Sequence, residues 1–369
     1  MSNIDLREFV NINLVRHENS SISNIRDTVV LYTNAQHTPV LDDNDQDTYT
    51  GLFDSLVGVD AYFAKETVPY KYLKMFFDNQ GIKVLVKDNV ALASFNADLI
   101  KTLDNKYICI AYANADTLTS QADVYDALVD IAEELAESTY GITQKILLAR
   151  SENDDEVNVK NFGVKYSTEV GAEMTIAAYL SGINVYKDDT VYDYAFTEEK
   201  IPESNINNET FKDLMNHNFN VDIDLANAVR NTGGNCKNGE DLVNSYVLII
   251  LHQTLTDALV NLLTQKIKGS QGVSQIYSAM TQELEKYLNC GYLATDKIWT
   301  DEDLIVTKNG VNYTIIEKGT PLLKGYSIKV LPFDSLTTAQ KANHEAPEVY
   351  VIIADQYGIR KITVTGEVL

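Results

Sequence analysis

Tyr107-Ile108-Cys109-Ile110-Ala111-Tyr112 is an almost wholly apolar stretch with the length of a buried β-strand. A helical pattern follows it, in which Ser120 can cap the N-terminus together with Asp123 three residues on. The apolar side chains of this helix recur on one face: Val124, Leu128, Ile131 and Leu135. Gly141 ends the pattern, and a second apolar strand occupies residues 145–149. Strand, helix and strand at this spacing predict a βαβ unit with a right-handed crossover.

The same α/β pattern extends to both sides of this unit. It predicts further strands at residues 28–32, 82–86 and 190–196. It predicts helices over residues 49–63, from Pro69 onward, and over residues 169–186. The polar stretch 198–209 contains Pro202 and several asparagines, which makes it the best candidate for a domain boundary.

A different pattern begins near residue 239. Apolar residues recur at helical spacing from Val243 to Leu263, and a second helix runs past Gly272 and ends at Gly291. Beyond it, Asn309-Gly310 is a strong two-residue hairpin signal between short strands. We expect two more strands, at 326–331 and 349–353, and a short helix at 336–344. A helix hairpin with flanking strands predicts a second domain.

Both ends of the chain read as strands. At the N-terminus, apolar residues alternate with polar ones at Val10, Ile12 and Leu14. In the last ten residues, 360–369, the apolar face carries Ile362, Val364 and Val368. An edge strand offers unpaired hydrogen-bonding groups, so each terminal strand must pair with its own sheet or with a sheet of another subunit.

These patterns predict an α/β (α+β mixed) chain with two or more domains and extended terminal strands. The predicted division is an N-terminal arm, an α/β domain, a C-terminal domain around a helix hairpin at 241–291, and a C-terminal arm strand. Their bounds are residues 1–24, 25–200, 201–354 and 355–369.

Composition excludes several classes of function. The chain has 369 residues, and its hydrophobic content of 45% is sufficient to form hydrophobic cores. Its net charge of −23 repels nucleic acids and anionic membranes. Three isolated cysteines (Cys109, Cys236 and Cys290) indicate reduced thiols and folding in the cytoplasm. Neither a signal peptide nor an uninterrupted apolar run of transmembrane length is evident.

No catalytic constellation is evident, so we expect neither an enzyme nor a bound cofactor. The acidic loop 42–47 resembles a calcium loop, but Thr48 stands where an EF-hand needs glycine, which favours a plain surface loop. The glycine-rich stretches 233–234 and 269–272 match no phosphate-binding loop, and we interpret them as turns. The histidines lack metal-ligand spacing: His17, His37, His217, His252 and His344.

Several segments, taken in order, resemble the contractile tail sheath proteins of phages and phage-tail-like particles, including bacteriocins, and in particular a compact sheath branch. Residues 75–86 pair two aromatics, a glycine turn and an alternating strand, and residues 173–184 match a helix rich in small residues. The fullest likeness spans 239–299, from Gly-Glu-Asp-Leu through Leu262-Leu263 to Cys-Gly-Tyr-Leu-Ala and Trp299.

Three dipeptides before the closing strands complete the likeness: Gly325-Tyr326, Ala346-Pro347 and Gly358-Ile359. One departure concerns the helix before Ala346, where that branch carries arginines and this chain has Lys341 and His344. A charge contact made by those arginines is therefore not carried over to this chain.

The resemblance implies a structural role in the virion tail, assembled in the host cytoplasm. Sheath subunits stack as hexameric rings around a tail tube and contract to drive the tube through the host envelope. The implied partners are identical subunits, the tube protein, and baseplate and terminator proteins, without nucleic acid or membrane insertion. The terminal strands would then join neighbouring subunits. Two alternatives stay open: a baseplate or sheath-terminating protein with the same fold, and an α/β hydrolase.

Overall fold

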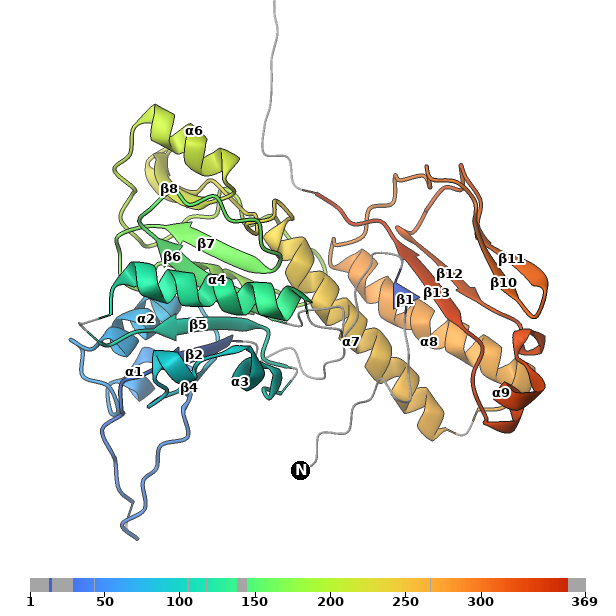
Figure 1. Cartoon of the computed structure of the whole chain (residues 1–369), viewed down its shortest axis with the longest axis horizontal. Coiled ribbons are helices and arrows are strands. Elements are labelled where there is room, and N and C mark those ends of the chain that lie inside the picture. The colour runs from blue at the N-terminus through green and yellow to red at the C-terminus, as the bar shows by residue number, and fades with distance from the viewer. Residues whose placement is uncertain are drawn as a thin grey trace, which may run out of the picture.

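An eight-stranded mixed sheet organises the first part of the chain, in the order β3-β4-β2-β5-β6-β7-β8-β9 (Figure 1). This computed structural model describes residues 13–14, 29–42, 44–104, 106–116, 119–137, 145–265 and 267–357. The strands from β4 to β8 in this order run parallel, and the edge strands β3 and β9 are antiparallel to their neighbours. The strands are β2 (Val29–Thr33), β3 (Leu52–Phe53), β4 (Val84–Lys87), β5 (Cys109–Ala113), β6 (Ile146–Ser151), β7 (Phe162–Tyr166), β8 (Asn220–Leu225) and β9 (Ala228–Asn231).

Helices cover both faces of this sheet, so successive residues of a strand enter different cores. In β2, Val29 and Leu31 belong to one apolar cluster, whereas Val30 and Tyr32 belong to the other. The first cluster is covered by α1 (Leu56–Val59), α2 (Val68–Asp78), α5 (Met174–Gly182) and α7 (Leu242–Thr264). The second is covered by α3 (Ala97–Lys101), α4 (Gln121–Glu137) and α6 (Asn208–Asn216), with the short 3₁₀ turn η2 (Leu92–Ser94) nearby.

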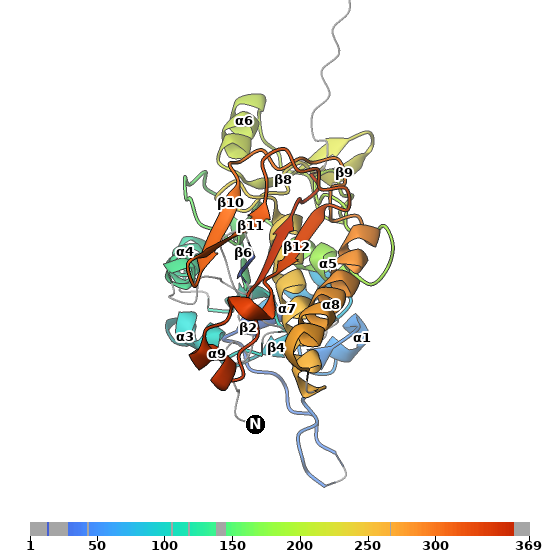
Figure 2. The same cartoon turned by 90° about the vertical axis from the view of Figure 1, so that its right-hand side faces the viewer.

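The helix α7 links this sheet to the C-terminal elements, crossing diagonally between them in Figure 1. It packs against α8 (Gly269–Asn289), and β12 (Tyr326–Val330) packs on α8. A second sheet has the order β1-β13-β12, with β1 (Asn13–Leu14) and β13 (Val349–Ile353). A separate hairpin pairs β10 (Leu304–Lys308) with β11 (Val311–Ile316), and η3 (Phe333–Ser335) precedes α9 (Thr338–Ala342). Figure 2 shows these C-terminal elements facing the viewer.

The first apolar cluster does not end at the large sheet. It continues through α7 and α8 and includes Tyr326 of β12 and Val351 of β13. A third, smaller cluster lies beneath the β10–β11 hairpin, around Ile316, Leu331 and Ile352. The large sheet and the β12–β13 pair are therefore joined by one continuous core.

By length and hydropathy alone, α7 could cross a membrane, with 23 residues and a mean hydropathy of 1.5 over its most apolar window. It is nevertheless packed inside the protein, and the buried positions include the polar side chains of Asn244, His252 and Gln253. A core helix of a folded domain explains this composition.

The structure confirms the α/β class, the βαβ unit and the helix hairpin expected at 241–291. Two local predictions are wrong. Residues 49–63 form only the short helix α1 after the edge strand β3, because the Gly51 carbonyl accepts from the Val86 N–H (2.6 Å) and holds the chain extended. Residues 190–196 form no strand, since the N–H groups of Thr190 and Val191 donate to the Cys290 carbonyl at the end of α8.

The predicted domain division remains a prediction, and the large sheet runs past its boundary at residue 200. Both β8 and β9 come from the 201–354 segment and complete the sheet of the preceding one. The boundary candidate 198–209 crosses the rim of this sheet: the Ser204 N–H donates to the Asp222 carbonyl of β8 (2.8 Å).

Candidate assembly interface

Neither edge of the large sheet presents a long, uncovered strand within the described ranges. Segment 196–199 lies along β9 and bonds to its backbone: the Phe196 N–H donates to the Asn231 carbonyl (2.6 Å) and the Glu199 N–H to the Val229 carbonyl (2.9 Å). At the opposite edge, β3 is only two residues long. Covered or very short edge strands hinder pairing with other chains, so the described part of this sheet presents no long, uncovered strand for strand addition.

The C-terminal sheets differ, because their outer edges are open. In the described part of the chain, β12 pairs only with β13, and its residues Tyr326–Val330 make no other backbone hydrogen bond. The β10–β11 hairpin likewise pairs only with itself, and Ile305 and Val311 are about half exposed at 49% and 51%. Open edges and exposed β-branched residues make this region the best candidate for pairing between subunits.

Of the predicted interface residues, Leu14 lies in β1, which runs parallel to β13 of the same chain. The register pairs Asn13 with Tyr350 and Leu14 with Val351. The other predicted residues lie outside the described part of the structure: Val10, Ile12, Ile362, Val364 and Val368. Their role in joining subunits remains a prediction.

The last described residues are fixed to the body of the protein. The Ala294 N–H donates to the Ala354 carbonyl (2.8 Å) and the Gln356 N–H to the Tyr292 carbonyl (2.9 Å). The Asn244 side chain, in the first turn of α7, donates to the Gln356 carbonyl (3.2 Å). These contacts fix the last described residues to the body of the protein, and no local sequence pattern indicates the part played by Asn244.

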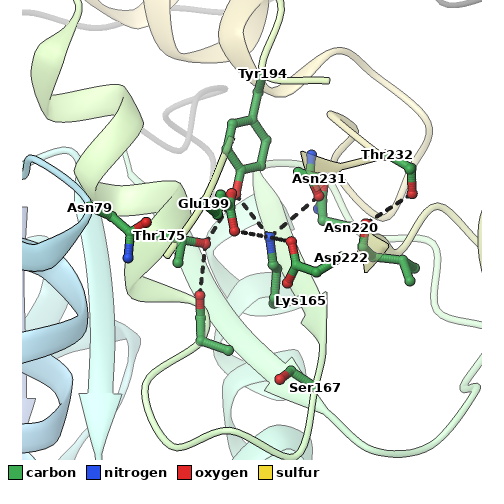
Figure 3. Close-up of polar contacts among 12 residues, drawn as sticks. Asn79, Lys165, Ser167, Thr175, Tyr194, Glu199, Asn220, Asp222, Asn231 and Thr232 are labelled. Carbon is green, nitrogen blue, oxygen red and sulfur yellow. Dashed lines mark hydrogen bonds and ion pairs between the residues drawn. The ribbon is translucent and has the colours of Figure 1, made fainter. Parts of the chain in front are cut away.

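A buried polar cluster lies in the large sheet, around Lys165 of β7 and Asp222 of β8 (Figure 3). The Lys165 ammonium of β7 is fully buried and pairs with Glu199 (2.6 Å) and Asp222 (2.7 Å). The Tyr194 hydroxyl donates to Glu199 and also bonds with the Thr175 hydroxyl (3.1 Å). Burial raises the pKa of Asp222 to about 7, because the Lys165 charge that opposes it is shared with Glu199.

This cluster suits a structural role better than a catalytic one. Lys165 and Asp222 are 0% exposed, so no substrate reaches the ammonium or the carboxylate. The cluster instead ties β7 and β8 to the 194–199 segment that covers β9. The sequence signal for it was a lysine inside an apolar strand, with an aspartate inside another, at Val221-Asp222-Ile223.

Other chemically active groups are engaged in local structure. All three cysteines are buried and free, and burial raises their thiol pKa values, to about 12 for Cys236 and about 11 for Cys290. Among the described residues, no group of three or more His, Cys, Asp or Glu could hold a metal ion. In the acidic loop, the Asp42 carboxylate accepts the N–H groups of Asn44 (2.8 Å) and Gln46 (2.9 Å), which stabilises the loop's own turn.

Comparison with known proteins gives matches in structure alone. No family model and no curated protein matches the chain. A chain in the cryo-EM structure of the anti-feeding prophage baseplate matches with a TM-score of 0.64 and 14% identity, covering 97% of both chains. The contracted helical sheath of the same prophage gives a TM-score of 0.59 at 15% identity, covering 94% of this chain and 95% of that one.

A third solved structure agrees with these two. The contracted sheath complex of an extracellular contractile injection system, PVC, gives a TM-score of 0.58 at 12% identity, covering 97% of this chain and 95% of that one. At such identities the likeness concerns the fold, and it extends over nearly the whole length of each chain. The chain has the fold of the sheath proteins of contractile injection systems, as its sequence segments indicated.

Proposed function

We propose that this protein is a structural subunit of a contractile tail sheath, in a phage or a phage-tail-like particle. Its subunits would stack as hexameric rings around a tail tube and contract to drive the tube through a host envelope. The observation that carries the proposal is the fold match to two contracted sheaths over 94% and 97% of this chain. The three solved structures reported above are a baseplate and two sheaths, which agrees with a role without catalysis.

The placement of open sheet edges supports the joint that such a polymer needs. Strand addition uses backbone hydrogen bonds, so one free edge can accept an extended segment of another copy. We place the acceptor at the outer edge of β12, beside β13. The donors would be the terminal arms of another copy, with Val10 and Ile12 in one and Ile362, Val364 and Val368 in the other. Leu14, predicted with them, pairs with Val351 of its own chain and would anchor the N-terminal arm at β13.

Contraction would be driven by the difference in contacts between two packings of one subunit. A difference of about 1 kcal/mol for each subunit is small beside the stability of a folded domain. Summed over the many subunits of a sheath, it becomes a large driving force. No chemical fuel is needed in this scheme.

Electron microscopy of the purified protein tests the proposal directly. We expect tubes or stacked rings in negative stain, with a polymerised fraction that rises with protein concentration. A monodisperse monomer at high concentration would contradict the proposal.

Deleting residues 360–369 tests the arm separately. We expect a chain that keeps its circular dichroism and thermal transition but no longer polymerises. A matched pair of variants refines the test. Ile362→Asp with Val364→Asp alters the predicted apolar face, whereas Thr363→Asp with Thr365→Asp adds equal charge to the other face. The first pair should abolish polymers and the second should weaken them far less. Unfolding of the truncated chain would instead assign the strand to the protein's own core.

A baseplate or sheath-terminating protein is the second candidate, because the TM-score of 0.64 to a chain in a baseplate exceeds the 0.59 to a sheath. Microscopy separates the two. A sheath subunit polymerises into tubes of open-ended length, whereas a baseplate or terminating protein stops at single rings or binds only to the ends of existing tubes.

A further inference from the structure

His37 occupies an unusual position between two carboxylates. Its Nδ1 lies 2.6 Å from Asp88 Oδ2, and its Nε2 lies 2.6 Å from Asp47 Oδ2. A carboxylate only accepts hydrogen bonds, so both ring nitrogens must carry a proton to bond on both sides. The geometry therefore requires the doubly protonated, positively charged imidazolium.

The two carboxylates belong to different parts of the fold. Asp88 directly follows β4 of the large sheet, whereas Asp47 lies in the acidic loop that joins β2 to β3. This loop projects well away from the sheet in Figure 1. The sequence has no Lys or Arg from residue 27 to residue 64, so His37 is the one side chain of this segment that can carry a positive charge. Through its ring, the loop is tied to the sheet.

Among the described residues, two aromatic rings and two carboxylates face the imidazole. Besides the two carboxylates, the Tyr49 ring stacks on it with centroids 3.8 Å apart and planes 9° apart, and the Tyr62 ring meets it edge-on at 6.2 Å. Burial and the neighbouring carboxylates raise the pKa of Tyr49 well above its usual range, so that ring stays neutral. The charge at this place is thus determined by His37, Asp47 and Asp88.

We propose that His37 is a proton-operated clip, which holds the acidic loop against the end of β4 while its ring is charged and releases it on deprotonation. A neutral ring can donate to only one carboxylate, and its other nitrogen then turns a lone pair toward the second. Asp47 is the partner expected to separate, because its side chain is 35% exposed against 16% for Asp88. The backbone N–H of His37 also donates to Asp88 (3.1 Å). This hydrogen bond does not depend on the charge of the ring, so it keeps the first residues of the loop in place.

The electrostatics of the site agree with this assignment. Burial by itself disfavours the charged ring, but the hydrogen bonds and charges of Asp47 and Asp88 outweigh it and raise the pKa of His37 above 6.5. A group whose pKa is raised on folding stabilises the fold at pH values below its ordinary pKa. That contribution is lost as the pH rises through the raised pKa of His37, so the clip opens as the pH rises.

Hydrogen–deuterium exchange read by mass spectrometry tests the clip on the full chain, whether assembled or not. Exchange at the histidine ring carbon reports the pKa of each imidazole, and amide exchange over residues 38–48 reports the order of the loop after correction for intrinsic rates. We expect His37 to titrate above pH 6.5 and the loop amides to lose protection over the same pH range. In His37→Gln the protection should be low and independent of pH.

Two further variants complete the test. Asp88→Asn removes one carboxylate and should lower the His37 titration midpoint by about one pH unit, while it keeps the ring itself. His217→Gln removes a histidine that pairs with Asp154 elsewhere and should leave the loop profile unchanged. A His37 midpoint at or below 6.5, or a loop profile that is the same in wild type and in both site variants, would overturn the proposal.

Discussion

Replacing Asp222 by Asn should remove a pH dependence that the buried Lys165 cluster builds into the stability of the protein. Lys165 pairs with Glu199 at 2.6 Å and Asp222 at 2.7 Å, and all three side chains are almost fully inaccessible to water. One ammonium cannot neutralise two buried carboxylates. The cluster therefore retains one more proton than the same groups would hold in the unfolded chain.

The sign follows from the direction of the shift. Burial, together with the Glu199 charge, raises the pKa of Asp222 from 3.8 to about 7, against the attraction of Lys165. Between these two values the folded state binds more protons than the unfolded state, so the free energy of unfolding falls as the pH rises. A pKa difference of one corresponds to about 1.4 kcal/mol, which gives a total loss of about 4 kcal/mol between pH 4 and pH 7.

Urea denaturation at pH 5, 6, 7 and 8 measures this effect on wild type and Asp222→Asn in parallel. The difference in unfolding free energy between them cancels the pH dependence of all other groups. From pH 5 to pH 8, we expect the unfolding free energy of wild type to fall by at least about 2 kcal/mol more than that of the variant. Asp224→Asn, at an exposed position two residues along the same strand, is the control and should follow wild type.

Two results would contradict a raised pKa at Asp222. A difference that stays flat with pH would mean that Asp222 does not change its protonation over this range. A difference of opposite sign, with wild type gaining stability as the pH rises, would mean that both carboxylates are ionised in the folded protein and that Lys165 stabilises the pair.

Three further substitutions test the packing of the fold. Lys237→Met removes a buried ammonium that donates to two backbone carbonyls (2.8 Å each) and lies 3.6 Å from the Phe219 ring centroid. Urea denaturation should show that the free energy of unfolding falls by about 2 kcal/mol. An unchanged denaturation midpoint would count against these contacts. Gly171→Ala places a Cβ 2.9 Å from the Tyr72 Cα, at a backbone φ of +83°. The melting temperature should fall, corresponding to a loss of stability of about 3 kcal/mol. An unchanged melting temperature would show that the backbone relaxes around the added methyl group. Asn244→Ala should leave the thermal transition nearly unchanged while amide exchange at residue 356 rises several-fold. Equal exchange in wild type and variant would show that the Asn244 side chain does not hold residue 356 in place.

Local signals in the sequence predict the elements that they directly encode. The capping box expected at Ser120 is present, because the Asp123 N–H donates to the Ser120 hydroxyl (3.1 Å) and the Ser120 N–H donates to the Asp123 carboxylate (3.0 Å). Asn309 and Gly310 both adopt positive φ values, 50° and 77°, as a two-residue hairpin turn requires. These features depend on residues close in sequence, so periodicity and turn chemistry are sufficient to find them.

Features that depend on distant residues could not be predicted in this way. The segment 190–196 has the alternation of a strand, yet it bonds to the end of α8, about a hundred residues further on. The parallel pairing of β1 with β13 joins nearly opposite ends of the chain, and nothing in either strand specifies it. The ion pairs of Lys165 join side chains from three separate segments, and they were not predicted from the sequence.

The continuous core limits how such a subunit could move in a polymer. Val351 of β13 and Tyr326 of β12 belong to the same apolar cluster as the large sheet, so rotating the β12–β13 pair against the sheet would expose buried side chains. Exposing even one large apolar side chain costs about 2 kcal/mol, more than the difference proposed between the two packings of a subunit. Strand addition at an open edge carries no such cost, because its backbone bonds persist while the connecting segments turn. We therefore expect each subunit to rotate as a rigid body during contraction, with the change in angle taken up by the arms between subunits.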